Sequence, residues 1–356
     1  MRKSIAIIIT SILVLSGCNK QQSVSDRLLN EVEKAIAINP DSASNLLKGI
    51  SSPEKLDNKT FARWCMLSGK ITDEIFNSIL PTYQLERAYD WYSSHGSPDE
   101  QVQILIYLGR SYFADGDYDK AMSIYTNALD IAEKNKLNNL TGYTYSYIGD
   151  LYGEKFMRTE AIKRYKAAAE CFKKENNTDS YACALRDVGR EYACIDSLSR
   201  ALKILTIADS VARNTKNIEV TASIDNALGN IYAMQNKYDK AEEYFLKALV
   251  GRETMPDYMA LIDLYIASGA INKAQELLSK ILQDNPKYTY SIKYLYYQIY
   301  NEEKNYKEAL TNLKEYVEIT DSIIYADNQS KILNIESKYN HLKISKEVDK
   351  IGRAHV

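Results

Sequence analysis

The sequence predicts an all-α fold, a solenoid of antiparallel helix hairpins, and three observations lead to that prediction. Apolar residues recur at helical spacing through most of the chain. No proline occurs between Asp99 and Met255, and proline costs about 3 kcal/mol inside a helix. One pattern occurs four times at a spacing of 40 residues, centred on the glycines Gly109, Gly149, Gly189 and Gly229.

Other residues keep fixed positions relative to these glycines. A tyrosine follows each glycine by three residues, and alanines follow it by 12 and by 19. A bulky residue stands between the two alanines of each repeat: Tyr125, Tyr165, Leu205 and Phe245. Glycine and alanine lack bulk, so two helix backbones can approach closely there and the bulky side chain fills the space beside them. The pattern therefore predicts hairpins that stack one on the next.

This set of residues resembles the tetratricopeptide repeat (TPR) family, whose repeats carry Leu-Gly-x2-Tyr on a first helix and Ala-x3-Phe-x2-Ala on a second. The period of 40 residues exceeds the usual 34, and the closing proline is missing, which fits the longer-helix variant of that family. The resemblance implies a right-handed TPR superhelix that binds proteins or peptides and has no catalytic activity.

The repeats divide the chain into parts. Residues 24–95 predict two less regular helix pairs, a degenerate TPR-like region. Residues 97–320 predict six TPR units, opened by a capping box of Ser97 and Glu100. The last two units are shorter and carry Ile262 and Tyr297 where the small residue stands in the others. Residues 321–350 predict a charged C-terminal helix.

The N-terminus predicts an export signal. Arg2 and Lys3 precede an apolar run that is too short for a comfortable membrane span. Directly after it, Leu15-Ser16-Gly17-Cys18 resembles the lipobox of bacterial lipoproteins, which implies that Cys18 is lipidated and becomes the mature N-terminus. We therefore assign 1–18 to a lipoprotein signal peptide; a plain signal peptide with an incidental cysteine is the alternative.

The C-terminus suggests that the natural reading frame continues. The last six residues, 351–356, back-translate with allowed codons to the start of a common sequencing adapter, so we interpret them as an artefact that follows Lys350. Residues 335–340 resemble the juxtamembrane helix that follows the TPR array in membrane-bound sensors and regulators of Bacteroidetes. In those proteins a transmembrane helix and an output module come next.

The sequence offers little chemistry. Its three histidines have no partner at metal-ligand spacing, so we expect no metal and no cofactor. It contains no glycine-rich phosphate loop, nucleophile elbow or His-Glu-x-x-His helix, so we predict that the protein is not an enzyme. A net charge of −2 gives no reason to expect nucleic-acid binding.

The four cysteines besides Cys18 are either free thiols or include a disulfide pair. Cys183 and Cys194 lie eleven residues apart on one predicted helix, about 16 Å, so they cannot bond to each other. Cys171 can meet one of them across a repeat junction if the exported protein forms a disulfide. We favour free thiols that fill small helical positions for Cys65, Cys171, Cys183 and Cys194.

The candidate binding residues come from the resemblance. In the TPR family the fifth and ninth positions of each first helix line the concave groove, and the candidate binding residues among them are Arg110, Asp150, Arg186, Arg190, Asn226 and Asn230. The last four predict a donor-rich patch suited to backbone carbonyls or a carboxylate. The patch departs from the family's lysine-based carboxylate clamp, so specificity for a C-terminal peptide stays open. A solvated polar face is the alternative.

We therefore predict an exported lipoprotein of the cell envelope that faces the periplasm. It binds a protein or peptide on its concave TPR face and the membrane through its N-terminal lipid. One alternative is the truncated periplasmic sensor half of a TPR transmembrane transcriptional regulator or sensor kinase. The other is an outer-membrane assembly factor. The partner's identity is not readable, because a solenoid binds through surface detail that one sequence does not expose.

Overall fold

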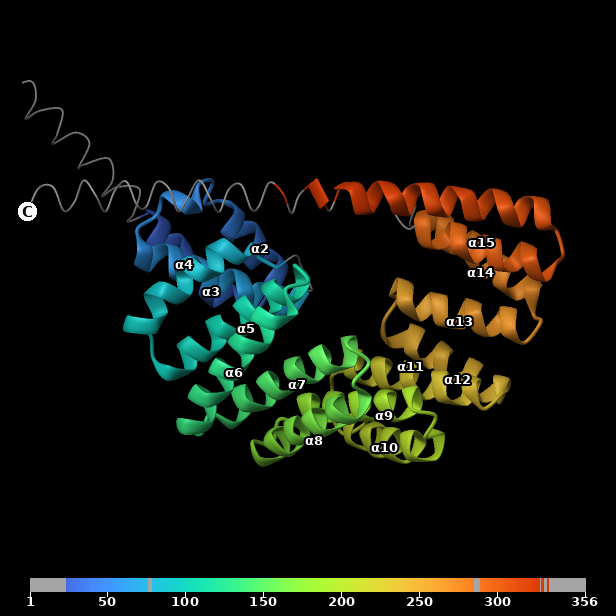
Figure 1. Cartoon of the computed structure of the whole chain (residues 1–356), viewed down its shortest axis with the longest axis horizontal. Coiled ribbons are helices and arrows are strands. Elements are labelled where there is room, and N and C mark those ends of the chain that lie inside the picture. Colours follow the sequence, from blue (N-terminus) through green and yellow to red (C-terminus); the bar gives the residue numbers. More distant parts are fainter. Residues whose placement is uncertain (1–23, 76–78, 285–288, 327, 330–331, 333–356) are drawn as a thin grey trace, which may run out of the picture. The chain divides into compact units, whose positions relative to one another are not determined.

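The computed structural model describes residues 24–75, 79–284, 289–326, 328–329 and 332 (Figure 1). Within these ranges the chain consists of helices joined by short turns and contains no strand, so the predicted all-α solenoid is confirmed. The predicted signal peptide with Cys18, the adapter-derived tail and most of the predicted 321–350 helix lie outside the described residues.

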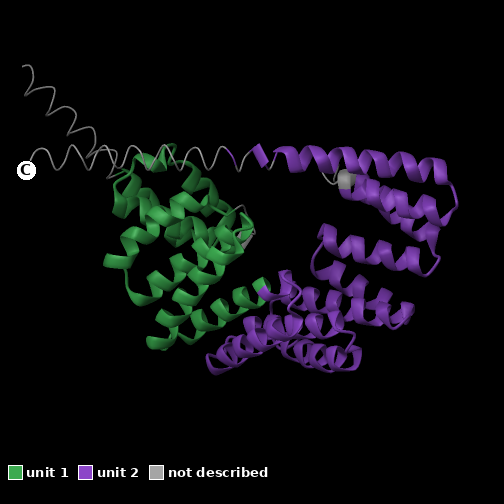
Figure 2. Ribbon diagram, in the orientation of Figure 1, with its two compact units in different colours: residues 1–151 green, residues 152–356 purple. Residues whose placement is uncertain are grey.

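The chain forms two compact units, residues 1–151 and 152–356 (Figure 2). The boundary between them falls within α7 (Asn138–Glu154), inside the second 40-residue repeat. The two units are described separately below.

Unit 1 begins with a helix over residues 24–36. The elements after it are α2 (Pro40–Lys48), the 3-10 helix η1 (Pro53–Lys55), α3 (Asn58–Ile75), α4 (Thr82–His95), α5 (Pro98–Ala114), α6 (Tyr118–Lys134) and most of α7. The capping box predicted for α5 is present: the Ser97 backbone N–H donates to Glu100 Oε2 at 2.9 Å. Asn39 caps α2 by accepting from the Ser42 backbone N–H at 2.8 Å.

Unit 2 continues the hairpins from the end of α7. Its elements are α8 (Arg158–Lys174), α9 (Thr178–Cys194), α10 (Leu198–Ala212), α11 (Ile218–Met234), α12 (Tyr238–Gly251), α13 (Met255–Ala267), α14 (Ile271–Asp284), α15 (Thr289–Glu302) and a helix over residues 306–326. Its core continues without a break from Phe245 through Ile262 to Ile299, so the bulky Ile262 packs inside the fifth hairpin.

Helix length explains the long period. In the first regular unit, α5 and α6 have 17 residues each, and three-residue turns follow each of them. The helices α7, α9 and α11 also have 17 residues and begin 40 positions apart. The extra residues relative to the usual TPR therefore lengthen the helices rather than the turns.

The repeat glycines lie where the sequence predicts a close helix approach. A Cβ added at Gly189 would stand 2.6 Å from Leu205 Cγ, and one added at Gly229 would stand 2.6 Å from Phe245 Cε1. No side chain fits at such distances, so in these two repeats the first helix rests directly on the bulky residue of the second helix. All eight repeat alanines are fully buried: Ala121, Ala128, Ala161, Ala168, Ala201, Ala208, Ala241 and Ala248.

The turn between the first and second helix has a fixed backbone geometry. The residue seven positions after each repeat glycine has a positive φ. In the first repeat this residue is Gly116. In the other three repeats φ is 57° at Phe156, 56° at Asp196 and 57° at Asn236. Glycine, asparagine and aspartate adopt this left-handed conformation with little strain, whereas phenylalanine does not. Phe156 is also 80% exposed, so packing does not compensate for the strain.

Replacing Phe156 therefore tests how much strain this turn holds. We expect Phe156→Gly to be more stable than Phe156→Ala by about 1 kcal/mol, because only glycine relieves the left-handed strain. Both variants lose the Phe156 ring, which lies 5.0 Å from the Arg158 guanidinium, so their comparison isolates the backbone. Urea unfolding measures the difference. Equal stability of the two variants would contradict the strain.

Candidate functional site

The first helices of unit 2 form a continuous inner row. Helices α9 and α11, α11 and α13, and α13 and α15 pack against one another directly, whereas the second helices α10 and α12 do not pack to that extent. First helices therefore lie closer together than second helices do, as expected on the concave side of a solenoid. Four predicted groove residues lie on this row: Arg186 and Arg190 on α9, and Asn226 and Asn230 on α11.

Arg186 is held between two helices. Its Nε and Nη2 donate to the two carboxylate oxygens of Asp187 at 2.9 and 3.1 Å, and its Nη1 donates to Ser223 Oγ on α11 at 3.0 Å. A bidentate guanidinium–carboxylate pair is directional and neutralises the charge. Arg186 therefore ties α9 to α11, and most of its donors are used within the chain. The candidate residues predicted from the sequence did not include Asp187, although it directly follows Arg186.

Arg190 is the exposed cation of the row. Its side chain is 66% exposed, and its Nη1 lies 3.9 Å from Asp187 Oδ1, a long ion pair that leaves other guanidinium N–H groups toward solvent. It stands one helical turn after Arg186, on the same face of α9. Of the two arginines predicted for the patch, Arg190 is the one available to a ligand.

Asn226 and Asn230 belong to a chain of hydrogen bonds. Asn230 Nδ2 donates to Asn226 Oδ1 at 2.9 Å, and Asn226 Nδ2 donates to Asp257 Oδ1 on α13 at 2.9 Å. The side chain of Asp257 is fully buried, and Arg252 donates to both of its oxygens at 3.0 Å. A buried carboxylate needs such partners. Asn226 therefore ties α11 to α13, and the exposed Asn230 lies at the end of the chain.

The remaining two predicted groove residues lie in unit 1. Arg110 pairs with Asp73, and its guanidinium lies 5.5 Å from the centre of the Tyr147 ring. Its side chain is mostly buried. Burial raises the pKa of Tyr147 to about 12; the Arg110 charge opposes this shift and the Asp150 charge adds to it. Arg110 is therefore packed and paired within unit 1, whereas Asp150 is exposed.

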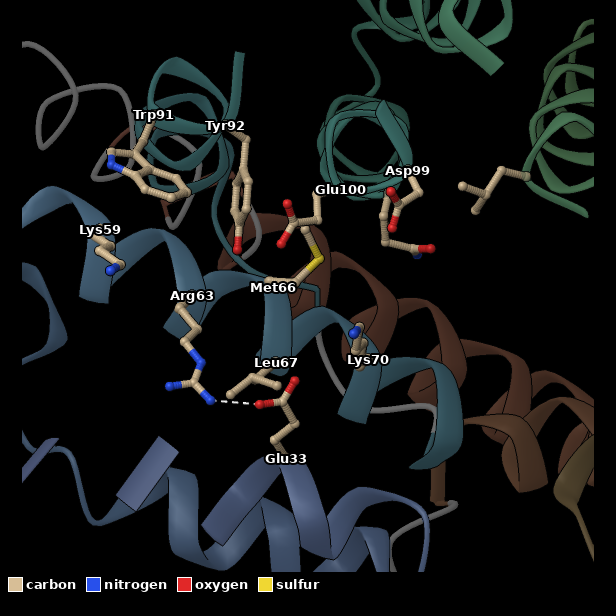
Figure 3. Close-up of a pocket in the computed structure, with 12 residues that line it drawn as sticks. Glu33, Lys59, Arg63, Met66, Leu67, Lys70, Trp91, Tyr92, Asp99 and Glu100 are labelled. Carbon is tan, nitrogen blue, oxygen red and sulfur yellow. Dashed lines mark hydrogen bonds and ion pairs between the residues drawn. The ribbon is translucent and has the colours of Figure 1, made fainter. Parts of the chain in front are cut away.

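Unit 1 also contains a pocket that sequence reasoning missed (Figure 3). Its volume is about 260 Å³. The helix 24–36 and helices α3, α4, α5 and α7 contribute its lining: Glu33, Lys59, Arg63, Met66, Leu67, Lys70, Trp91, Tyr92, Asp99, Glu100, Gln103 and Leu140. Lys59, Arg63, Met66 and Lys70 follow a helical spacing of four, three and four residues, so one face of α3 forms the floor.

The pocket contains charges of both signs. Arg63 Nη2 lies 2.6 Å from Glu33 Oε2, and Glu100 is engaged in the α5 capping box. Burial and the Glu100 charge raise the pKa of Tyr92, so its hydroxyl stays protonated. The volume is slightly below the usual range for small-molecule pockets. The helical spacing on α3 was visible in the sequence, but the partners from other helices were not.

Cys65, Cys183 and Cys194 are free thiols, and Cys171 is half-buried. Cys65 is fully buried, and burial raises its pKa and that of Cys183. Cys194 differs from the expectation of a buried thiol: it ends α9 and is exposed, because a helix end lies outside the packed interior. Among the described residues, no group of three or more His, Cys, Asp and Glu side chains is arranged to hold a metal. No helix in the described ranges is long and apolar enough to span a membrane.

Comparison with protein families finds tetratricopeptide repeats in two segments. Residues 105–138 and residues 221–255 match family models described as tetratricopeptide repeat. They correspond to the first and the fourth of the regular repeats. A comparison with curated proteins finds no match.

Solved structures with this fold include peptide complexes. A Rap protein complexed with competence and sporulation factor superposes with a TM-score of 0.64 at 18% identity, over 86% of this chain and 88% of that one. NprR in complex with its cognate peptide NprX gives 0.52 at 17% identity, over 85% and 94%. A tetratricopeptide repeat protein from Parabacteroides merdae gives 0.51 at 17% identity, over 72% and 93%. The chain therefore has a TPR fold, a protein-interaction scaffold that is typically non-catalytic.

Proposed function

We propose that this protein is a non-catalytic, lipid-anchored TPR protein of the cell envelope that binds a protein or peptide partner. The partner lies along the first-helix row of unit 2 and contacts Arg190 on α9 and Asn230 on α11. The anchor is a lipid on Cys18, and the body faces the periplasm.

The exposed state of Arg190 is the observation that carries the binding proposal. Its neighbour Arg186 is neutralised by Asp187, so Arg190 presents a cation on a row whose other polar groups are mostly paired. A carboxylate of the partner can form a charge-assisted hydrogen bond with it. Asn230 Nδ2 donates to the backbone oxygen and to Oδ1 of Asn226 within the row, and the Asn230 amide oxygen can accept from a backbone N–H of the partner. These groups fit an extended peptide with an acidic side chain.

The relatives support a peptide as the kind of partner. The Rap protein and NprR, which have the same fold, were each solved with a signalling factor or cognate peptide. The lipid anchor rests on different support, the Leu15-Ser16-Gly17-Cys18 sequence directly after an apolar run. A chain anchored by two or three acyl groups stays on the membrane, which brings the binding row to partners in the envelope.

Charge reversal at Arg190 tests the binding row. Peptides of 15 residues are first selected on the full chain from a random phage-displayed library. We expect Arg190→Glu to weaken the selected acidic peptides at least tenfold in fluorescence polarisation, because attraction becomes repulsion. Lys203→Glu is the matched control, since it makes the same charge change on the exposed surface of the second helix α10. Equal affinity of Arg190→Glu and Lys203→Glu would remove this row as the binding surface.

Removal of the Cys18 thiol tests the anchor. In a bacterial host that processes lipoproteins, we expect Cys18→Ser to abolish incorporation of radiolabelled palmitate and to move the protein out of the detergent phase. Cys194→Ser is the control, because Cys194 is an exposed thiol elsewhere in the chain. Palmitate incorporation that survives Cys18→Ser would exclude this anchor, while leaving the peptide-binding row untouched.

A further inference from the structure

The helix over residues 306–326 has one packed side and one apolar, uncovered side. Ala309 and Asn312 are buried, and the Tyr316 ring lies 5.2 Å from the Tyr294 ring of α15. A Lys293–Glu315 ion pair at 2.5 Å adds to this contact with α15. In Figure 1 this is the orange-red helix that follows α15. Its packed side is therefore occupied by its own hairpin.

The opposite side carries a row of exposed apolar residues. Leu310, Val317 and Ile324 follow one another at seven-residue spacing and are 54%, 46% and 52% exposed. Tyr306 stands one turn before Leu310 and is also exposed. Seven residues are almost two helical turns, so these side chains share one face. We call these four residues the outer stripe.

Residues 321–326 of this helix are exposed at every position, including Ile323, Ile324 and Tyr325. Exposed apolar rows of this kind mark interaction surfaces.

The charges beside the stripe favour a second copy of this helix as its partner. Lys314 and Asp321 lie on the same side of the helix as the stripe, are exposed, and form no ion pair among the described residues. When two copies of the helix lie antiparallel with Val317 against Val317, Leu310 meets Ile324 and Lys314 lies beside Asp321. The attraction between Lys314 of one copy and Asp321 of the other then occurs twice, once on each side of the two-fold axis. In a parallel pair the two-fold axis runs along the helices, so Lys314 and Asp321 of the two copies lie on opposite sides of the interface and do not meet.

We propose that the outer stripe is a dimerisation surface, at which two copies of this chain pair antiparallel through their 306–326 helices. The pairing buries Leu310, Val317 and Ile324 of both copies. It leaves α15 of each copy on the far side of its own helix, because α15 packs on the opposite face. The proposal does not depend on the peptide-binding row or on the lipid anchor.

Disulfide crosslinking of the full chain tests both the contact and its direction. Cys18 and the exposed Cys194 are first replaced by serine to remove competing thiols. Residues 310 and 324 are about 21 Å apart along one helix, too far for a bond within one chain. We expect the double variant Leu310→Cys and Ile324→Cys to give a dimer band on a non-reducing gel, and Leu310→Cys alone to give none.

The other outcomes overturn the proposal in different ways. A dimer from Leu310→Cys alone shows a parallel arrangement, because residue 310 meets its own copy only in that direction. No dimer from either variant shows that no second copy covers the stripe, as when another segment of the same chain lies on it. Since all these positions are exposed, unchanged circular dichroism checks that the fold is intact.

A charge swap provides an independent measurement in the double-cysteine background. We expect Lys314→Glu alone and Asp321→Lys alone each to reduce the crosslinked fraction severalfold, and the two together to restore it. Lys280→Glu on α14 is the matched control, because it changes an exposed lysine of the same unit far along the chain from the stripe. A crosslinked fraction that the combined swap does not restore contradicts the proposed register.

Discussion

The contact between a glycine of the first helix and a bulky residue of the second fixes the geometry of the third and fourth regular hairpins. In the third repeat the backbone at Gly189 rests directly on Leu205, and in the fourth Gly229 rests on Phe245. No other residue type permits this approach, because any Cβ would overlap the partner side chain. The fully buried alanines then allow the neighbouring helices to approach. The spacing of the first helices, and therefore of the binding row, depends on this contact.

The hairpins could be predicted because their determinants are local and periodic. The glycine, the tyrosine and the two alanines recur at fixed positions, and the helix starts follow from short signals such as the Ser97–Glu100 capping box. The strained turn at Phe156 was not predicted, since nothing in its residue type favours a positive φ. The shorter units after α12 were recognised even though Ile262 occupies the small position, because their remaining apolar spacing is preserved.

The candidate site could be predicted only in part. Family positions pointed to Arg186, Arg190, Asn226 and Asn230, and four such polar residues do lie on the first-helix row of unit 2. Their partners could not be read from the same positions. Asp187 neutralises Arg186, and Asp257 binds Asn226 from the next first helix along the chain. Hydrogen bonds between helices depend on the packing, so only the structure separates the residues that tie helices together from the exposed Arg190.

The first-helix row of unit 2 and the outer stripe place different demands on the same fold. Along the row, polar side chains are mostly paired, and one exposed cation offers a directional contact. At the outer stripe the surface is apolar, and recognition rests on burial and on the order of the charges beside it. A solenoid accommodates both, because each hairpin contacts only its neighbours and its surface can change without disturbing the core elsewhere.

The double-mutant cycle of Gly189→Ala and Leu205→Ala tests the central contact most directly, by urea unfolding of the full chain. Without a clash, Gly189→Ala should stabilise the helix by about 1 kcal/mol. The contact predicts instead a loss of about 1–3 kcal/mol from overpacking. It also predicts that the double variant is more stable than the sum of the two single effects, because Leu205→Ala removes the atoms that the new methyl group meets. Strict additivity, or a stabilising Gly189→Ala, would contradict the account.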